Sequence, residues 1–149
     1  CTVDTWEFLS LVKEGQELQN KGNNEAALSA YRKAIGLYKG NFLPRDLYEP
    51  WADSKRRELK HQYIDLLLRS AKIEETRGSL TKAIALYEKV IREDPYLELT
   101  YQRLMTLYFD RGKQNEALKV YEKCKKALRE GLDTKPDSVT KAIHKKISA

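Results

Sequence analysis

The sequence predicts an all-α fold of three antiparallel helix hairpins stacked side by side, followed by a helix that closes the C-terminal end. The first observation is composition, because seven Gly and four Pro in 149 residues leave little room for β-hairpins. The second is a gapless motif of glycine, alanine and tyrosine that occurs three times. The third is the length of the chain, which suffices for one domain with its own core.

The repeated motif is carried by three segments that align without gaps. They read "GNNEAALSAYRKAI" from Gly22, "GSLTKAIALYEKVI" from Gly78 and "GKQNEALKVYEKCK" from Gly112. In each segment alanine follows the glycine by five residues and tyrosine follows it by nine. The set is Gly22, Ala27 and Tyr31; Gly78, Ala83 and Tyr87; Gly112, Ala117 and Tyr121.

Each motif predicts the turn and second helix of a hairpin. Glycine ends the first helix, because it adopts the left-handed conformation without steric cost. Asn23 or Ser79 is suited to cap the helix that follows. The small alanine lets two antiparallel helices approach closely, and the tyrosine fills the space between neighbouring hairpins.

The expected helices follow in order, with breakers between them. Asp94-Pro95 is a favourable start for the fifth helix, and Asp137 or Ser138 is expected to cap the last. The helices are expected at about 4–20, 24–38, 51–77, 80–93, 96–110, 114–130 and 138–147. Together they give a single domain over 1–149, with hairpins at about 4–38, 51–93 and 96–130, an insertion at 39–50 and the closing helix at 138–147.

The insertion "YKGNFLPRDLYEPW" is irregular but rich in aromatic residues. Its candidate packing or docking residues are Phe42, Leu43, Tyr48 and Trp51. We favour burial of these side chains against the first hairpin, since each buried ring would contribute about 1.5–3 kcal/mol. The alternative is an exposed aromatic cluster that docks a partner.

Positive charge gathers in the last third of the chain. Residues 100–149 carry twelve Lys and Arg against six Asp and Glu, and the whole chain has a net charge of +6. We favour a solvated surface on two amphipathic helices, with cations near helix C-termini. The alternative is weak contact with the DNA backbone or with an acidic protein surface. The residues concerned are Lys113, Lys119, Lys123, Lys125, Lys126, Arg129, Lys141, Lys145 and Lys146.

Catalytic, cofactor and metal sites are not expected. Cys1 and Cys124 lack metal-ligand spacing, and we expect Cys124 to be a buried free thiol. His61 and His144 have no convergent partners in the sequence. A free thiol fits a reducing cytoplasm, where we expect the protein to be. Apolar runs of membrane-spanning length and a signal peptide are also missing from this sequence. Met105 is the only methionine, so we expect this chain to be part of a longer one.

The repeat resembles the tetratricopeptide repeat, because the last two motifs begin 34 residues apart. The resemblance implies a right-handed superhelix in which the first helix of each hairpin lines a concave groove. The family's clamp for chaperone tails has Lys and Asn where Val12 and Gln16 stand, so that variant is disfavoured. The candidate groove residues are Val12, Gln16, Asp65, Lys72, Gln102, Arg103 and Phe109.

Order and spacing over nearly the whole chain also resemble the bacterial transcriptional activator domain of antibiotic-regulatory-protein-type regulators. The insertion carries Tyr38, Gly40, Phe42, Leu43, Pro44, Tyr48 and Trp51 in that family's pattern. The opening "VDTWEFLSLVKEG" and an ending with Pro136, Asp137 and Thr140 agree with it. Asp137 departs from the family's usual serine, but both residues cap helices.

This resemblance implies a regulatory, protein-interaction domain whose winged-helix DNA-binding domain precedes Cys1 and lies outside the chain. The implied partners are an RNA polymerase subunit, the protein's own DNA-binding domain or a second copy. DNA would be bound only through the upstream domain. The main alternative is a peptide-binding adaptor that has no link to transcription. A small-molecule sensor is a third class, and it would require an apolar cavity.

Overall fold

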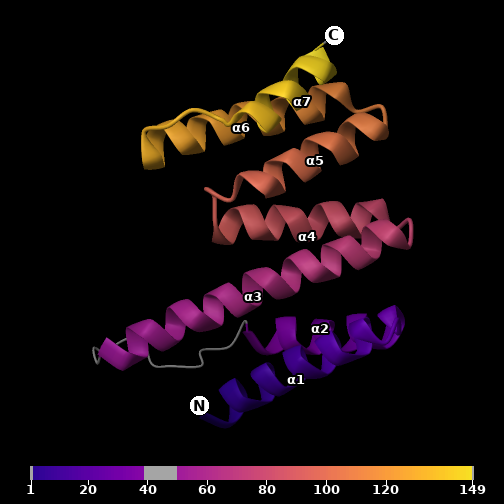
Figure 1. The fold of residues 1–149 in the computed structure, drawn as a ribbon, viewed down its shortest axis with the longest axis vertical. Coiled ribbons are helices and arrows are strands. Elements are labelled where there is room, and N and C mark those ends of the chain that lie inside the picture. Colours follow the sequence, from indigo (N-terminus) through magenta and orange to yellow (C-terminus); the bar gives the residue numbers. More distant parts are fainter. Residues whose placement is uncertain (1, 39–49, 149) are drawn as a thin grey trace. The chain divides into compact units, whose positions relative to one another are not determined.

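A computed structural model gives the structure of residues 2–38 and 50–148, and for residues 2–5 and 50–53 it describes the helical backbone alone. Within this part of the chain there are seven α-helices and no strands (Figure 1), which confirms the all-α prediction. The helices are α1 (Thr2–Asn20), α2 (Asn24–Tyr38), α3 (Pro50–Thr76), α4 (Leu80–Glu93), α5 (Glu98–Asp110), α6 (Gln114–Leu132) and α7 (Ser138–Ser148). None of these described helices is both long and apolar enough to span a bilayer.

Two compact units make up the chain, Cys1–Ile73 (unit 1) and Glu74–Ala149 (unit 2), and their boundary lies inside α3. One continuous core through all three hairpins therefore stays a prediction. The insertion residues Phe42, Leu43 and Tyr48 lie outside the described residues, as does the side chain of Trp51. The choice between a buried and an exposed insertion stays open.

The glycine turns are confirmed at all three repeats, with φ of +82° at Gly22, +81° at Gly78 and +75° at Gly112. At the first turn the Gly22 N–H donates to Gln19 O at 3.0 Å, and the Asn23 N–H donates to Leu18 O at 2.9 Å. The same pair of hydrogen bonds recurs at the other two turns. This is the Schellman arrangement, which satisfies the last carbonyls of a helix and needs a left-handed residue.

Helix starts agree with the predictions in part. Asn23 caps α2 by accepting the Ala26 N–H at 3.3 Å, whereas Ser79 makes no side-chain hydrogen bond at the start of α4. The prediction that Asp94-Pro95 begins the fifth helix is wrong, since α5 begins at Glu98. Asp94 instead ends α4, and its carboxylate accepts the Tyr96 N–H at 3.2 Å. Residues 94–97 form a turn before the helix, in which the Leu97 N–H donates to Asp94 O at 3.4 Å.

The alanines of the motif are fully buried, as expected for close helix contacts: Ala27, Ala83 and Ala117 are each 0% exposed. In unit 1 the closest approach is at Gly15 of α1. A Cβ built there would lie 2.3 Å from Cε1 of Tyr31, so the tyrosine ring occupies the space of the missing side chain. Glycine at position 15 thus fixes how closely α1 and α2 pack.

Unit 1 is completed by contacts between α2 and α3. The rings of Tyr38 and Tyr63 stack with centroids 3.9 Å apart, and Phe8 packs against Tyr38 at 5.8 Å. Buried leucines on α3, among them Leu59 and Leu67, continue this apolar layer. Aromatic pairs at such distances add to the stability given by area burial.

Unit 2 ends with α7 packed against α5 and α6. Ile147 of α7 joins Met105 and Tyr121 in one buried cluster. Asp137 caps α7, as expected, by accepting the Thr140 N–H at 3.0 Å. α7 therefore covers apolar surface that α5 and α6 would otherwise leave exposed.

Candidate functional site

Two of the motif tyrosines, Tyr31 and Tyr87, hold the helices of their hairpins together through their hydroxyl groups. Tyr31 donates to Gln19 Oε1 at 2.8 Å, so the second helix of the hairpin is tied to the first. Burial raises the pKa of Tyr31, and the nearby charge of Arg69 opposes that rise. Arg69 belongs to α3, the first helix of the next hairpin. Tyr31 therefore contacts that helix as well as its own hairpin.

Tyr87 repeats this arrangement in unit 2. Its hydroxyl donates to the carboxylate of Glu75, and Arg103 of α5 lies beside it. Burial, followed by the hydrogen bond to Glu75, raises the pKa of Tyr87 well above its usual range. Arg103 was predicted to line the groove, yet its position beside Tyr87 gives it a packing role.

Tyr121 has a different neighbour. The ring of His144 on α7 stacks on it, with centroids 3.7 Å apart and an interplanar angle of 10°. His144, the lone histidine of α7, thus covers a ring face of Tyr121, whereas Arg69 and Arg103 interact with the hydroxyl groups of Tyr31 and Tyr87. Each of the three tyrosines thus makes a structural contact between helices within its own unit.

The groove residues predicted in unit 1 do not share one environment. Val12 is 3% exposed and therefore belongs to the apolar interior, where it is inaccessible to a ligand. Asp65 is ion-paired with Arg69 at 2.8 Å. Gln16 is half-buried and Lys72 is exposed. Among these four predicted residues, Lys72 is the most exposed.

The groove residues predicted in unit 2 also contact other parts of the protein. Gln102 donates from Nε2 to Thr140 Oγ1 at 2.9 Å and thereby fastens α7 to α5. Phe109 packs against the cluster that contains Met105 and Tyr121. Because the seven candidates come from both units, the groove as a whole stays a prediction.

A polar network between α5 and α7 was missed by the sequence reasoning. Glu98 accepts hydrogen bonds from the Thr140 hydroxyl and, at 3.0 Å, from the Asp137 N–H. Thr140 is fully buried. The sequence pattern indicated Asp137 as a possible cap of the last helix and Thr140 as part of the chain's ending, and it indicated no partner on the fifth helix for either. Glu98 lies 42 residues before Thr140, and nothing in its local pattern indicates this pairing.

The described residues offer few groups suited to catalysis or metal binding. Cys124 is fully buried, and burial raises the pKa of its thiol to about 12, so it remains protonated and unreactive at neutral pH. Across the described ranges 2–38 and 50–148, no group of three or more His, Cys, Asp or Glu side chains is placed to hold a metal ion.

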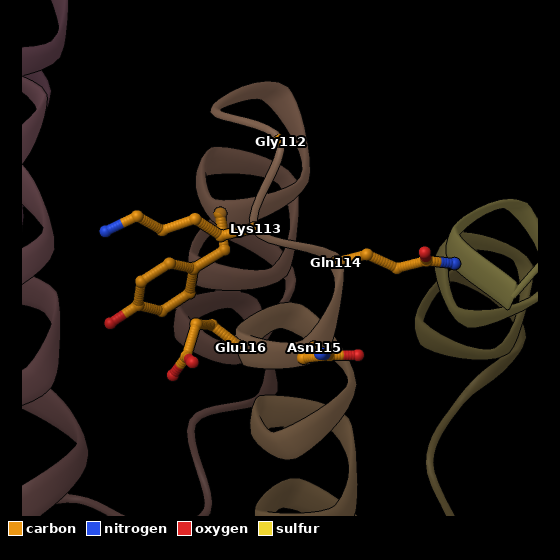
Figure 2. Close-up of a pocket in the computed structure, with 6 residues that line it drawn as sticks. Gly112, Lys113, Gln114, Asn115 and Glu116 are labelled. Atoms are coloured by element: carbon orange, nitrogen blue, oxygen red, sulfur yellow. The ribbon is translucent and has the colours of Figure 1, made fainter.

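One surface hollow of about 510 Å³ lies at the turn between α5 and α6, lined by Tyr108, Gly112, Lys113, Gln114, Asn115 and Glu116. Figure 2 shows Gln114 pointing to one side, while Lys113 and Glu116 point to the other. Gln114 is already engaged, since its Nε2 donates to Ile147 O at 2.6 Å. Binding sites need convergent polar groups, and these side chains diverge.

A second hollow, of about 400 Å³, lies where α6 ends and α7 begins. We call it the basic hollow, and its lining residues are Tyr121, Lys125, Arg129, Asp133, Thr134, Lys135, Pro136 and Lys141. All of them belong to unit 2. Four cations and one carboxylate surround this hollow, which makes it a candidate site for an anionic group.

Solved structures with similar folds are domains of helical repeats. The C-terminal TPR-containing domain of a Plasmodium falciparum protein described as FK506-binding has a TM-score of 0.64 at 16% identity, covering 97% of this chain and 88% of that one. The TPR2B domain of yeast Sti1, in its pHsp70 complex, has a TM-score of 0.60 at 18% identity and covers 96% and 97%. These similarities confirm a tetratricopeptide-like fold.

Sequence comparison leads to a transcriptional regulator. Regulatory protein AfsR of Streptomyces griseus is 26% identical over 129 residues, which cover 85% of this chain but 13% of AfsR. The chain thus spans about an eighth of that relative. Residues 3–148 match the family described as bacterial transcriptional activator domain. This match includes all but the outermost residues, and the chain therefore belongs to the bacterial transcriptional activator domain family.

Proposed function

We propose that this chain is the protein-interaction domain through which a bacterial DNA-binding activator contacts RNA polymerase, a second copy or its own DNA-binding domain. The observation that carries the proposal is the family match over residues 3–148. The similarity to AfsR, a regulatory protein, supports it. DNA recognition is assigned to a winged-helix domain outside this chain. Because an activator works where the DNA is, we also propose a cytoplasmic location.

The chemistry of the described residues agrees with an interaction role and offers no support for an enzyme. The motif tyrosines, Arg69 and Arg103 are engaged in packing between helices. The one cysteine described, Cys124, is buried. Exposed apolar side chains such as Trp6, at 75% exposure, provide contact area for a protein partner.

An adaptor that binds peptides is the second candidate, because the Sti1 domain with a similar fold was solved in its pHsp70 complex. Two residues argue against the same mode of binding here. Val12 and Gln16 stand where the chaperone-tail clamp has Lys and Asn, and Val12 is buried. A buried valine cannot bind a peptide carboxylate, so the activator proposal is preferred.

The proposal is tested by fusing residues 1–149 to an unrelated bacterial DNA-binding domain. Transcription is measured from a promoter that carries the operator of that domain. We expect the fusion to raise transcription several-fold above the DNA-binding domain alone, because contact with polymerase depends on proximity once the domain is tethered.

Two further measurements make the result decisive. Purified RNA polymerase and the isolated chain are tested for direct binding, and the mass of the chain is measured by analytical ultracentrifugation. If the fusion fails to activate, and the chain neither binds polymerase nor forms dimers, the proposal is wrong.

A further inference from the structure

We propose that the basic hollow binds an acidic segment of a partner protein and takes up one bulky apolar side chain of that segment. This inference rests on the proposed interaction role and names the chemistry of the partner. Two properties of the hollow support it, the positive charge of its lining and the apolar character of its floor.

The cations of the hollow are available to a partner. Among the described residues, Arg129, Lys135 and Lys141 form no ion pair with a carboxylate. Lys125 is only loosely paired with Glu122, at 3.9 Å, and its ammonium lies 6.0 Å from the centre of the Tyr121 ring. Such unneutralised cations around a concave surface attract and hold carboxylates.

The floor of the hollow is apolar. The lining exposes more apolar than polar surface, with the largely buried Tyr121 and Pro136 at its base, so a ligand would meet apolar groups more than hydrated polar ones. A volume of about 400 Å³ lies in the range of small ligand pockets and accommodates a large side chain together with its flanking groups. The ligand is therefore expected to combine negative charge with an apolar group.

The rim of the hollow is held in a defined shape. Asp133 has φ of 52°, and the Thr134 N–H donates to Leu128 O at 3.2 Å, which closes the end of α6. Pro136 restricts the backbone that leads to α7. A rim that is ordered before binding loses less conformational entropy when the ligand arrives.

A DNA backbone suits this hollow less well than an acidic peptide. Phosphates are spread along a convex duplex and offer charge without an apolar group. They would leave the Tyr121 and Pro136 surface uncovered. An acidic segment with a Phe or Leu side chain fills the floor and pairs with the rim.

The probe is a fluorescein-labelled peptide of Glu and Asp residues with one Phe and one Leu at its centre. Its binding to the 149-residue chain is measured by fluorescence anisotropy at about 50 and 200 mM salt. One control peptide has Gln and Asn for the acids, and another has Ala for the Phe and Leu. Unrelated duplex DNA is the third control.

Two double variants are compared, and both remove two positive charges. The test variant is Arg129→Gln with Lys141→Gln, inside the hollow. The matched control is Lys123→Gln with Lys126→Gln, on exposed positions of α6 outside the hollow's lining. Circular dichroism melts verify that both variants are folded.

We expect the test variant to lose at least about tenfold in affinity for the acidic peptide, and the control variant to lose less than about threefold. Both control peptides should bind at least about fivefold more weakly than the probe. Equal losses in the two variants, an affinity unaffected by the Phe and Leu, or tighter DNA binding that depends on Arg129 and Lys141 would each overturn the inference.

Failure here is distinguishable from failure of the proposed function. If the acidic peptide does not bind but the tethered fusion still activates, the activator role stands and the hollow is not its contact site. If the peptide binds but the fusion is inactive, and the chain neither binds polymerase nor forms dimers, the activator proposal fails while the hollow stands as a site for acidic segments.

Discussion

Gly15 shows how one missing side chain sets the distance between two helices. The ring of Tyr31 lies where a Cβ would be, at 2.3 Å. Real Cβ atoms do not approach carbon so closely, and the ring is itself fixed by its hydrogen bond to Gln19. A methyl group at this position must therefore displace the ring or separate α1 from α2.

We expect Gly15→Ala to lower the free energy of unfolding by about 1–3 kcal/mol, as overpacked cores do. The matched control is Gly36→Ala on α2, where an added Cβ meets nothing within 4 Å. That control should raise stability by about 0.5–1 kcal/mol, because alanine favours the helix. Urea unfolding followed by circular dichroism measures both, and equal effects would contradict the packing argument.

Asp137 gives the start of α7 a dependence on pH. The Thr140 N–H, the Thr140 hydroxyl and further donors hold the pKa of the Asp137 carboxyl below its usual value. A carboxyl whose pKa is lowered by folding stabilises the folded state above its unfolded pKa, near 4. That stabilisation is lost as the pH falls through the lower, folded pKa.

We therefore expect α7 to loosen first in acid, below about pH 4. The protection factors of the amides of residues 138–148, which correct for the slower intrinsic exchange in acid, should fall there. Asp137→Asn should make exchange in α7 less sensitive to pH over the same window. An unchanged pH profile in that variant would show that another group controls the transition.

At the scale of elements, α7 depends on a buried polar network as well as on apolar packing. Thr140 is fully buried and hydrogen-bonds both Glu98 and Gln102. Buried polar groups that lose a partner cost about 1–3 kcal/mol. The attachment of α7 to α5 is thus specific as well as stable.

Thr140→Val keeps the shape of the side chain but removes its hydroxyl. We expect about 1–3 kcal/mol lower stability and faster amide exchange throughout α7. The control is Val139→Thr at the neighbouring, 54% exposed position, which should change stability by less than about 0.5 kcal/mol. Equal effects of the two substitutions would indicate that the network contributes little.

The hairpin turns were predictable because the end of a helix needs a residue in the left-handed conformation, and glycine adopts it without steric cost. Other features depend on partners distant in sequence. α5 begins later than predicted because Asp94 takes part in a turn before the helix. The sequence around Asp94 is compatible with either a turn or a helix start. The repeat pattern predicted Gln102 to line a groove. Its hydrogen-bond partner on α7, Thr140, lies 38 positions later, so neighbouring residues could not indicate this contact.

The basic hollow illustrates the same limit. The excess of lysine and arginine in residues 100–149 was plain from composition. Composition could not show which of those cations gather around one hollow, because the linker between α6 and α7 brings Lys135 and Lys141 toward Arg129. Only the tertiary structure shows which of these residues line the hollow and which lysines on α6 are solvated.

For the molecule as a whole, a net charge of +6 predicts weak electrostatic attraction to any polyanion. We expect the chain alone to bind duplex DNA no more tightly than about 10⁻⁶ M at physiological salt, since non-specific contacts rarely exceed that affinity. An electrophoretic mobility assay with unrelated duplexes measures this. Tight binding with a steep salt dependence would mean that the domain contributes directly to DNA recognition.

The stacking of His144 on Tyr121 has a consequence for how such a protein can lengthen. Another hairpin added after α7 would find the outer side of α6 already occupied. A hairpin that packed on α6 from that side would first have to displace α7 and break this ring contact.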